Sequence, residues 1–553
     1  MKTLAITLGV IGLTLLMSAT AWGQSVGDFG SLGTGTWGTT NANWRQWDGS
    51  GWNTVPASAP TASDNVWILS GHTVTVEASL KNCKNLTVES GAILRVSGTT
   101  VRYMIVSGSS VTNNGTLGGT SDGLSITCNI SVTISGTGTT RLNRLRAGAT
   151  SISIVIDKDM TLDVIAGGAA LYSNSFSSVT FTVNSGRTVT FGGTSFFSFG
   201  TSATTSTALS GTVNVNGTMT LPSGMNFNMN VTSGNTPTLN ISGTLNGGGT
   251  LLADGAGTEN VNINEGGALV LSSATTFENL AINNTSGFSP AQAITLNGTL
   301  TLTSGNITTT SSNLLTLGSA ASVSGGSSSS FVSGPMAHTI ANTSSTAKTF
   351  PIGKGSAYRP ITLTVTQDAA TSTTYTAEVF NSAPTTRTLP AEHDKVSLVR
   401  YWNVAKGAGA NVTNGSITIN YGADDGVTDP DHVRVAKDDG AGSWLALGGT
   451  GSGSGSGSII SNVNFTSFSD FTLMNHQPGT NPLPVQLTSF TATANRLDAV
   501  LRWGTATEVH NYGFEVERRG FAQIRTDSRG YDAQNDWKKV GFVAGSGNEY
   551  QSA

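Results

Sequence analysis

The first residues that could do chemistry form an acidic turn near position 158. Asp157, Lys158 and Asp159 stand between two short apolar runs, residues 152–156 and 160–165. Glycoside hydrolysis needs two carboxylates across a groove, and a lyase needs a basic side chain, usually beside a calcium ion held by carboxylates. These three residues are therefore the candidates for a polysaccharide-cleaving site. A solvated turn is the simpler interpretation, and we favour it.

A second acidic cluster lies further along the chain. It comprises Asp424, Asp425, Asp429 and Asp431. Oxygen-rich loops on extracellular domains can hold calcium at weak affinity, although the spacing of an EF-hand is absent here. We expect a polar hairpin loop and no cofactor here, and a structural calcium ion at these four residues is the alternative.

The remaining residue types offer no recognisable catalytic or zinc-binding motif. No two of the six histidines have H-x-x-x-H or H-E-x-x-H spacing, and the two cysteines are far from any Cys-His pattern. No nucleophile elbow or phosphate-binding loop stands in its required context. The histidines are His72, His338, His393, His432, His476 and His510.

Half of the ten tryptophans fall within residues 25–75. Aromatic faces can stack on sugars, so Trp37, Trp44, Trp47 and Trp52 are candidates for a glycan-binding platform. The first turn of a repeat protein has no neighbour on one side, and bulky side chains must close that open end. We therefore interpret residues 24–65 primarily as a Trp-rich N-terminal cap.

The composition indicates a folded all-β protein. Charged residues make up 11% of the chain and Gly contributes 69 residues, while Val, Ile and Thr recur in short alternating runs. The formal net charge of -4 is spread thinly. Nothing resembles a basic groove, so nucleic acid is not an expected partner.

The N-terminus has the features of a signal peptide, residues 1–23. Lys2 precedes an apolar run over residues 4–17, and Ala19-Thr20-Ala21 provides a cleavage site. No later segment has the length of a membrane span, so we expect no integral membrane segment after cleavage. The protein is predicted to be secreted or to lie on the outer cell surface.

Residues 66–335 are quasi-repetitive and predict a β-solenoid, with a right-handed parallel β-helix as the default form. Strands of about 4–6 residues alternate with Asn-Gly and Ser-Gly turns, and comparable units recur at loose spacings of about 20–30 residues. The outward positions are mostly Thr, Ser and Asn, which can stack in ladders between turns. A string of small β-sandwiches is the alternative.

The two cysteines, Cys83 and Cys128, are separated by about two such turns. Equivalent positions two turns apart exceed the reach of a disulfide. Export would allow a bridge, but we expect two buried free thiols.

Longer strands after residue 335 predict β-sandwich modules. Residues 336–477 are typical of an immunoglobulin-like sandwich with Trp402 and Trp444 in its core. Residues 478–484 form a linker, and residues 485–553 begin a fibronectin-like sandwich that is too short to be complete. A truncated sequence would account for this length.

Three segments resemble bacterial surface proteins that use the type IX secretion route. The tryptophan-rich start through Val76 resembles the beginning of their β-helical regions. The pieces 349–353, 400–402 and 468–473 resemble a sandwich that often follows the solenoid, and the stretch 483–518 is similar to their fibronectin type III-like module. The resemblance implies export and a role in adhesion, matrix or surface-layer architecture, without enzyme activity. The C-terminal sorting domain of such proteins is not visible here.

The sequence therefore predicts an exported, non-catalytic, adhesin-like or structural protein. Its expected partners are polysaccharides or other components of the cell surface or matrix. The alternative is a β-helix polysaccharide lyase or glycoside hydrolase that would use the Asp157–Asp159 turn, and this alternative rests on fold analogy.

Overall fold

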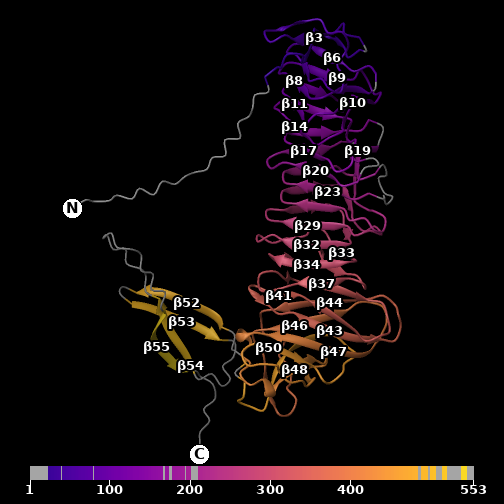
Figure 1. Ribbon diagram of the computed structural model, residues 1–553. Helices are drawn as coiled ribbons and strands as arrows, with labels where there is room; N and C mark the ends of the chain where they lie inside the picture. The colour runs from indigo at the N-terminus through magenta and orange to yellow at the C-terminus, as the bar shows by residue number, and fades with distance from the viewer. Residues whose placement is uncertain are drawn as a thin grey trace, which may run out of the picture. The chain divides into compact units, whose positions relative to one another are not determined.

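The computed structural model describes residues 23–38, 40–78, 80–165, 168–173, 177–192, 195–200, 209–481, 483, 487–495, 498–505, 513–519 and 537–544. These residues belong to two units, residues 1–143 and 144–553. They are almost entirely β-structure, and the helices among them are two single 3₁₀ turns, η1 (Ala423–Asp425) and η2 (Pro430–His432). The strands are labelled in Figure 1. The predicted signal peptide lies outside the described residues except for Gly23.

Unit 1 is a β-solenoid in which each turn contributes three short strands. Equivalent strands pair in parallel from turn to turn, as Val66 does with Leu86. The first sheet contains β5 (Val66–Ile68), β8 (Leu86–Val88), β11 (Ser110–Asn113) and β14 (Val132–Ser135). The second contains β6 (Thr73–Thr75), β9 (Ile93–Arg95), β12 (Thr116–Gly118) and β15 (Thr139–Leu142), and the third β7 (Lys81–Cys83), β10 (Arg102–Val106) and β13 (Leu124–Cys128).

The N-terminal segment of unit 1 extends these sheets before it closes them. Strands β1 (Phe29–Ser31) and β2 (Gly35–Thr36) pair in parallel with β5 and β6. Strands β3 (Trp44–Trp47) and β4 (Trp52–Thr54) then pair antiparallel beyond β1. The segment predicted as a cap therefore also supplies two strands to the solenoid sheets.

Unit 2 begins with a solenoid of the same kind. Sheet A contains β17 (Ser153–Ile156), β20 (Val179–Val183), β23 (Gly211–Val215), β26 (Thr238–Ile241), β29 (Asn260–Asn264), β32 (Asn279–Asn283), β34 (Thr299–Ser304) and β37 (Ser322–Gly325). Sheet B contains β18 (Met160–Leu162), β21 (Thr188–Phe191), β24 (Thr218–Leu221), β27 (Thr244–Gly247) and β30 (Ala268–Leu271). Sheet C contains β16 (Arg144–Ala147), β19 (Gly168–Tyr172), β22 (Ser195–Ser198), β25 (Asn226–Asn228) and β28 (Thr250–Leu252). The predicted β-solenoid is confirmed, with about 12 turns in the two units together.

The length of a turn varies more than the strand register, which shifts at bulges such as those between Ala169 and Leu171 and between Ile282 and Asn283. Val179 pairs with Gly211 across 32 residues, whereas Asn260 pairs with Asn279 across 19. The extra residues of the longer turns lie in the loops between strands. If they entered the strands, a register shift of one residue would turn the apolar side chains outward. Gly305 illustrates the tight corners: its φ is +78°, and a Cβ atom there would lie 1.7 Å from the carbonyl oxygen of Asn284.

The solenoid core of unit 2 is a stack of apolar ranks. Phe181 pairs with Val213, which pairs with Leu239, and all three side chains are fully buried. On sheet C, the rings of Phe197 and Phe227 stack at a centroid distance of 4.1 Å. Burial of apolar surface in these ranks contributes about 25 cal/mol of favourable transfer free energy per Å². Each added turn therefore stabilises its neighbours.

The last solenoid turns of unit 2 lead directly into antiparallel sheets. Strands β31 (Thr275–Phe277), β33 (Ile294–Leu296) and β36 (Leu315–Leu317) pair in parallel up to β39 (Met336–Ile340), which pairs antiparallel with β44 (Thr373–Phe380). The same sheet continues through β46 (Tyr401–Lys406), β51 (Asp470–His476), β48 (Val433–Asp438) and β49 (Trp444–Ala446), and β45 (His393–Val396) also pairs with β51. Pairing in this sheet changes from parallel to antiparallel at Met336, and the domain boundary at residues 335–336 stays a prediction.

Two smaller sheets accompany it. One consists of β40 (Thr346–Phe350), β43 (Ile361–Gln367), β47 (Val412–Tyr421) and β50 (Gly457–Ile460), and the other of β35 (Ile307–Thr308), β38 (Val332–Ser333), β41 (Ile352–Lys354) and β42 (Ala357–Tyr358). Trp402 and Trp444 are buried, as predicted. Near the C-terminus, β52 (Leu487–Asn495) pairs with β53 (Asp498–Thr505), and β54 (Gly513–Arg519) pairs with β55 (Trp537–Ala544).

Candidate functional site

The outer face of sheet A in unit 2 carries two ranks of small polar side chains in register. The first rank runs from Thr180 through Thr212 and Thr238 to Asn260 and Asn279. The second rank lies two residues further along each strand and consists of Thr182, Asn214, Asn240 and Asn262. Successive turns of a parallel sheet are about 4.8 Å apart, so the face repeats its hydrogen-bonding groups at that interval.

The asparagines of the second rank form a continuous hydrogen-bonded ladder. The Asn262 amide donates to Asn240 at 2.8 Å and the Asn240 amide donates to Asn214 at 2.9 Å. Asn214 in turn donates to the Thr182 hydroxyl at 3.2 Å. The predicted stacking of outward polar side chains is therefore confirmed. Each amide is held in one orientation by its neighbours, so the face is ordered before any ligand arrives.

The acidic turn at residues 157–159 is tied to the next solenoid turn. Arg187 donates from Nε to Asp157 Oδ1 at 3.1 Å, and the backbone N–H of Thr188 donates to Asp159 Oδ1 at 2.7 Å. Both carboxylates thus make contacts that hold two turns together. They do not stand across a groove with a basic side chain between them.

Lys158 points away from solvent. Its side chain is 2% exposed, and burial lowers its pKa to about 8. A lysine base of a polysaccharide lyase must reach a substrate in solvent, and burial of Lys158 prevents this in the structure. Asp157 and Asp159 are at least partly exposed whereas Lys158 is buried, so the turn is solvated at only two of its three residues. The enzymatic alternative stays a prediction.

The four candidate tryptophans divide into two pairs. Trp37 and Trp44 are fully buried and pack edge to face at a centroid distance of 4.8 Å. A buried ring offers no face to a sugar, which corrects the predicted glycan platform at two of its four positions. Trp47 and Trp52 are half-buried and pack at 5.2 Å. Trp67, the fifth tryptophan of the same segment, adjoins Trp52 at a centroid distance of 6.5 Å.

Two of the four predicted calcium ligands are neutralised by arginines. Asp425 is fully buried and accepts from Nε of Arg359 and Nε of Arg400, each at 2.7 Å. Asp424 also contacts both guanidinium groups. Burial alone would raise the pKa of Asp424, but the charges and hydrogen bonds of Arg400 and Arg359 outweigh it and lower the pKa.

A third candidate ligand, Asp429, is also engaged by neighbouring groups. Asp429 accepts from His432 Nδ1 at 2.7 Å and from the backbone N–H of Asp431 at 3.1 Å. Within the described residues, no three His, Cys, Asp or Glu side chains are already placed to hold a metal ion. Arginine, histidine and backbone groups thus engage Asp424, Asp425 and Asp429, and a calcium ion at the four residues stays a prediction.

Cys83 and Cys128 occupy equivalent positions two turns apart. Val106 pairs with Cys83 on one side and with Cys128 on the other. Both thiols are free and fully buried, which confirms the expectation from spacing. Burial raises the pKa of each thiol to about 12.

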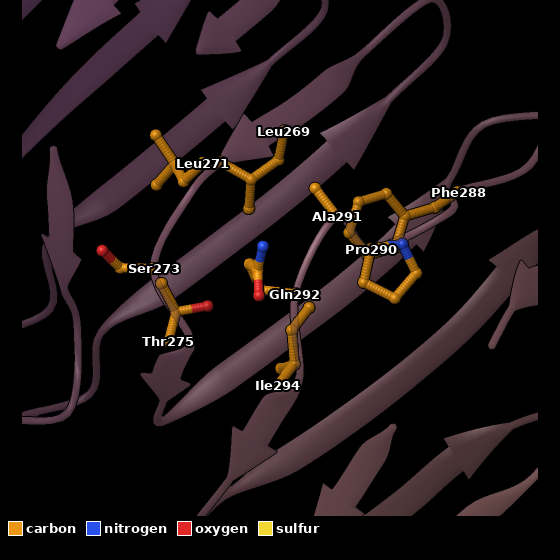
Figure 2. Close-up of a pocket in the computed structure, with 9 residues that line it drawn as sticks. All are labelled: Leu269, Leu271, Ser273, Thr275, Phe288, Pro290, Ala291, Gln292 and Ile294. Carbon is orange, nitrogen blue, oxygen red and sulfur yellow. The ribbon is translucent and has the colours of Figure 1, made fainter. Parts of the chain in front are cut away.

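A shallow, open depression lies beside β30, the last strand of sheet B in unit 2. Leu269 and Leu271 line one side, and Phe288 and Pro290 line the other, with the Gln292 amide near the centre (Figure 2). None of its nine lining residues is titratable. This depression therefore offers no acid or base and carries no argument for a binding site.

One comparison with known families gives a match. Residues 47–167 are similar to the G8 domain. G8 domains are rich in β-structure and typically extracellular, which fits the solenoid. Neither the curated proteins nor the solved structures give a match. In the described part of the chain, no helix has the length and apolar character to span a membrane.

Fold and match together define a class: a β-solenoid protein with a G8-like segment, which fits an extracellular location. The type IX resemblance and the fibronectin-like module stay predictions.

Proposed function

We propose that this chain is an exported, non-catalytic binding or structural protein, and that the outer face of sheet A in unit 2 is its glycan-contacting surface. The observation that carries the proposal is the ordered Thr/Asn face. Polysaccharides also repeat their hydroxyl groups along one axis, so a fixed ladder of amides and hydroxyls can form many weak hydrogen bonds with a chain of sugars. Each bond adds only about 0.5–1.5 kcal/mol, and affinity would come from their number.

The face also suits a long neutral ligand rather than a small charged one. Its two ranks consist of Thr and Asn side chains without a formal charge. Secretion or attachment to the outer cell surface, the adhesin-like role, and the immunoglobulin- and fibronectin-like class of the later modules belong to the same proposal.

The test measures retention and cleavage on one polysaccharide panel of neutral glucans, chitin and uronate polymers. Asn240→Lys places a charge on the ladder, and Thr220→Lys on the outer face of sheet B is the matched control. We expect wild type and the Thr220 variant to be retained, and Asn240→Lys to lose retention while its circular dichroism is unchanged. Equal retention of both variants would show that the binding site lies outside this face of sheet A.

The same panel tests the enzymatic alternative. Release of reducing ends or of unsaturated uronate that disappears in Asp157→Ala or Asp159→Ala would make the protein a polysaccharide-cleaving enzyme. Retention without product release would support the binding role.

A further inference from the structure

A lysine and an asparagine face each other across two neighbouring strands of the antiparallel sheet of unit 2. Lys395 of β45 pairs directly with Asn475 of β51. The register shifts between His393 and Lys395, so Asp394 is an extra residue in β45 and also stands opposite Asn475. Directly paired side chains project to one face of a sheet, with Cβ atoms about 4.5–5.5 Å apart. The register therefore brings an amine, a carboxylate and a carboxamide together.

The Asp394 carboxylate contacts both of the other side chains. Asn475 Nδ2 donates to Asp394 Oδ1 at 2.7 Å, and Lys395 Nζ lies 4.0 Å from Asp394 Oδ2. The group is largely shielded from solvent, since the side chains of Lys395 and Asp394 are 10% and 11% exposed and Asn475 is fully buried. A carboxylate in this position can move a proton between the amine and the amide nitrogen.

The carboxamide of Asn475 is held in one orientation, and its oxygen is surrounded by donors. The oxygen accepts from the backbone N–H of Asn481 at 3.2 Å and from Asn481 Nδ2 at 3.1 Å, and the Thr480 hydroxyl lies 2.7 Å from it. Asn475 Nδ2 donates its second hydrogen to the carbonyl oxygen of Gln477 at 3.0 Å. These partners fix which end of the amide is nitrogen. Donors aimed at a carbonyl oxygen stabilise the negative charge that forms there when a nucleophile adds to the carbon.

We propose that Lys395 and Asn475 join in a covalent isopeptide bond, which the folded chain forms by itself with Asp394 as the proton-transfer group. Asp394 first accepts a proton from the Lys395 ammonium, and the neutral amine attacks Cγ of Asn475. Asp394 then delivers this proton to Nδ2 and takes one proton from Nζ. The Cγ–Nζ bond forms, the Cγ–Nδ2 bond breaks and ammonia leaves, after which the proton on Asp394 passes to solvent. No oxidant, reductant or other reactant enters this balance.

The surroundings of Lys395 favour its amine as a nucleophile. Burial lowers the pKa of Lys395, while the charge of Asp394 opposes this effect. On the other side of β51, Val433 pairs with Asn475 and is fully buried, so apolar surface also shields the amide from water. A desolvated lysine is an activated nucleophile, and exclusion of water limits hydrolysis of the same carbonyl.

The bond gives β45 a covalent attachment to its sheet. β45 pairs with β51 at three positions, and one of them becomes a covalent cross-link between residues that are distant in sequence. A cross-link of this kind constrains the unfolded chain and holds the strand in place under denaturing or pulling conditions. The reaction occurs once in each chain and does not involve the proposed glycan-contacting face.

The experiment maps the purified, untagged full chain by tryptic digestion and mass spectrometry under denaturing conditions. We expect one branched peptide that joins Lys395 to Asn475, lighter by one ammonia than its two component peptides together, and no cleavage after Lys395. Lys395→Arg keeps the positive charge but not the nucleophile, so it should yield two separate peptides. Lys354→Arg, at a lysine of unit 2 whose side chain is 41% exposed, is the matched control and should keep the branched peptide.

A further variant tests the role of Asp394. Asp394→Asn cannot accept the proton, so the branched peptide should accumulate at least about 100-fold more slowly after cell-free synthesis than in the wild type. Separate peptides alone in the folded wild type, a branched peptide at Asn475 that persists in Lys395→Arg, or equal rates in wild type and Asp394→Asn would each overturn the proposal. The wild-type map is decisive even if a variant fails to fold. None of these results depends on polysaccharide binding.

Discussion

Acid should loosen the junction between the solenoid and the antiparallel sheets of unit 2 through one histidine. His338 lies in β39 with 2% exposure, and its Nε2 lies 3.0 Å from the carbonyl oxygen of Thr349. Burial, with a smaller contribution from Lys348, lowers its pKa to about 4. Between pH 6.5 and 4 the unfolded segment binds a proton that the folded segment does not, so stability falls as the pH falls.

The size of the effect follows from the two pKa values. One pH unit within that window is worth about 1.4 kcal/mol, so lowering the pH from 7.5 to 5.0 should cost about 2 kcal/mol. That corresponds to an increase of roughly 30-fold in the opening equilibrium of β39. Hydrogen exchange of peptides covering Met336–Ile340, corrected for intrinsic rates, measures this equilibrium locally.

The matched variant is His338→Gln, which keeps a donor for the Thr349 carbonyl oxygen but does not titrate. Its exchange protection should be nearly independent of pH over the same range. The reasoning is refuted if wild-type protection does not change between pH 7.5 and 5.0, or if the variant shows the same slope as the wild type.

Three further predictions follow from buried contacts. Asp425→Asn should destabilise the antiparallel part of unit 2 by about 3–5 kcal/mol, because Arg359 and Arg400 lose their buried counter-charge; a thermal scan showing less than about 1 kcal/mol would contradict this. Cys83 and Cys128 should resist a thiol reagent in the native protein at pH 8 and react fully in denaturant, since burial raises the pKa of both thiols to about 12; rapid native labelling would show that unit 1 opens. Asn240→Ala should increase hydrogen exchange in β23 and β29 by about 5-fold or more through the loss of two ladder bonds of roughly 1 kcal/mol combined, with Thr220→Ala as the control; unchanged exchange would mean that the ladder adds no stability.

Much of the fold could be predicted from the sequence. Strand periodicity, Asn-Gly turns and the scarcity of charge indicated parallel turns with outward Thr and Asn, and the spacing of Cys83 and Cys128 indicated that they cannot bridge. The third strand of each turn was missed, because strands such as β13 are buried throughout and do not alternate. The parallel strands in the predicted cap were missed because Trp and Gly dominate that segment.

The candidate sites were less accessible to sequence reasoning. Proximity along the chain suggested that Asp424 and Asp429 would share a site. Folding instead placed Asp424 and Asp425 against Arg359 and Arg400, which are distant in sequence. Lys158 stands in a charged turn but is buried. His393, His432 and His476 lie near one another without a spacing motif, because they come from β45, η2 and β51.

The sequence by itself determined the all-β class, the inward and outward faces of each strand, and the polar character of the solenoid surface. These depend on local periodicity, which is a property of neighbouring residues. Only the tertiary structure decided which residues of successive turns pair with each other, because loops of variable length separate equivalent strands. The ion pairs and the amide ladder both depend on that register, and register is fixed by packing between segments far apart in the chain.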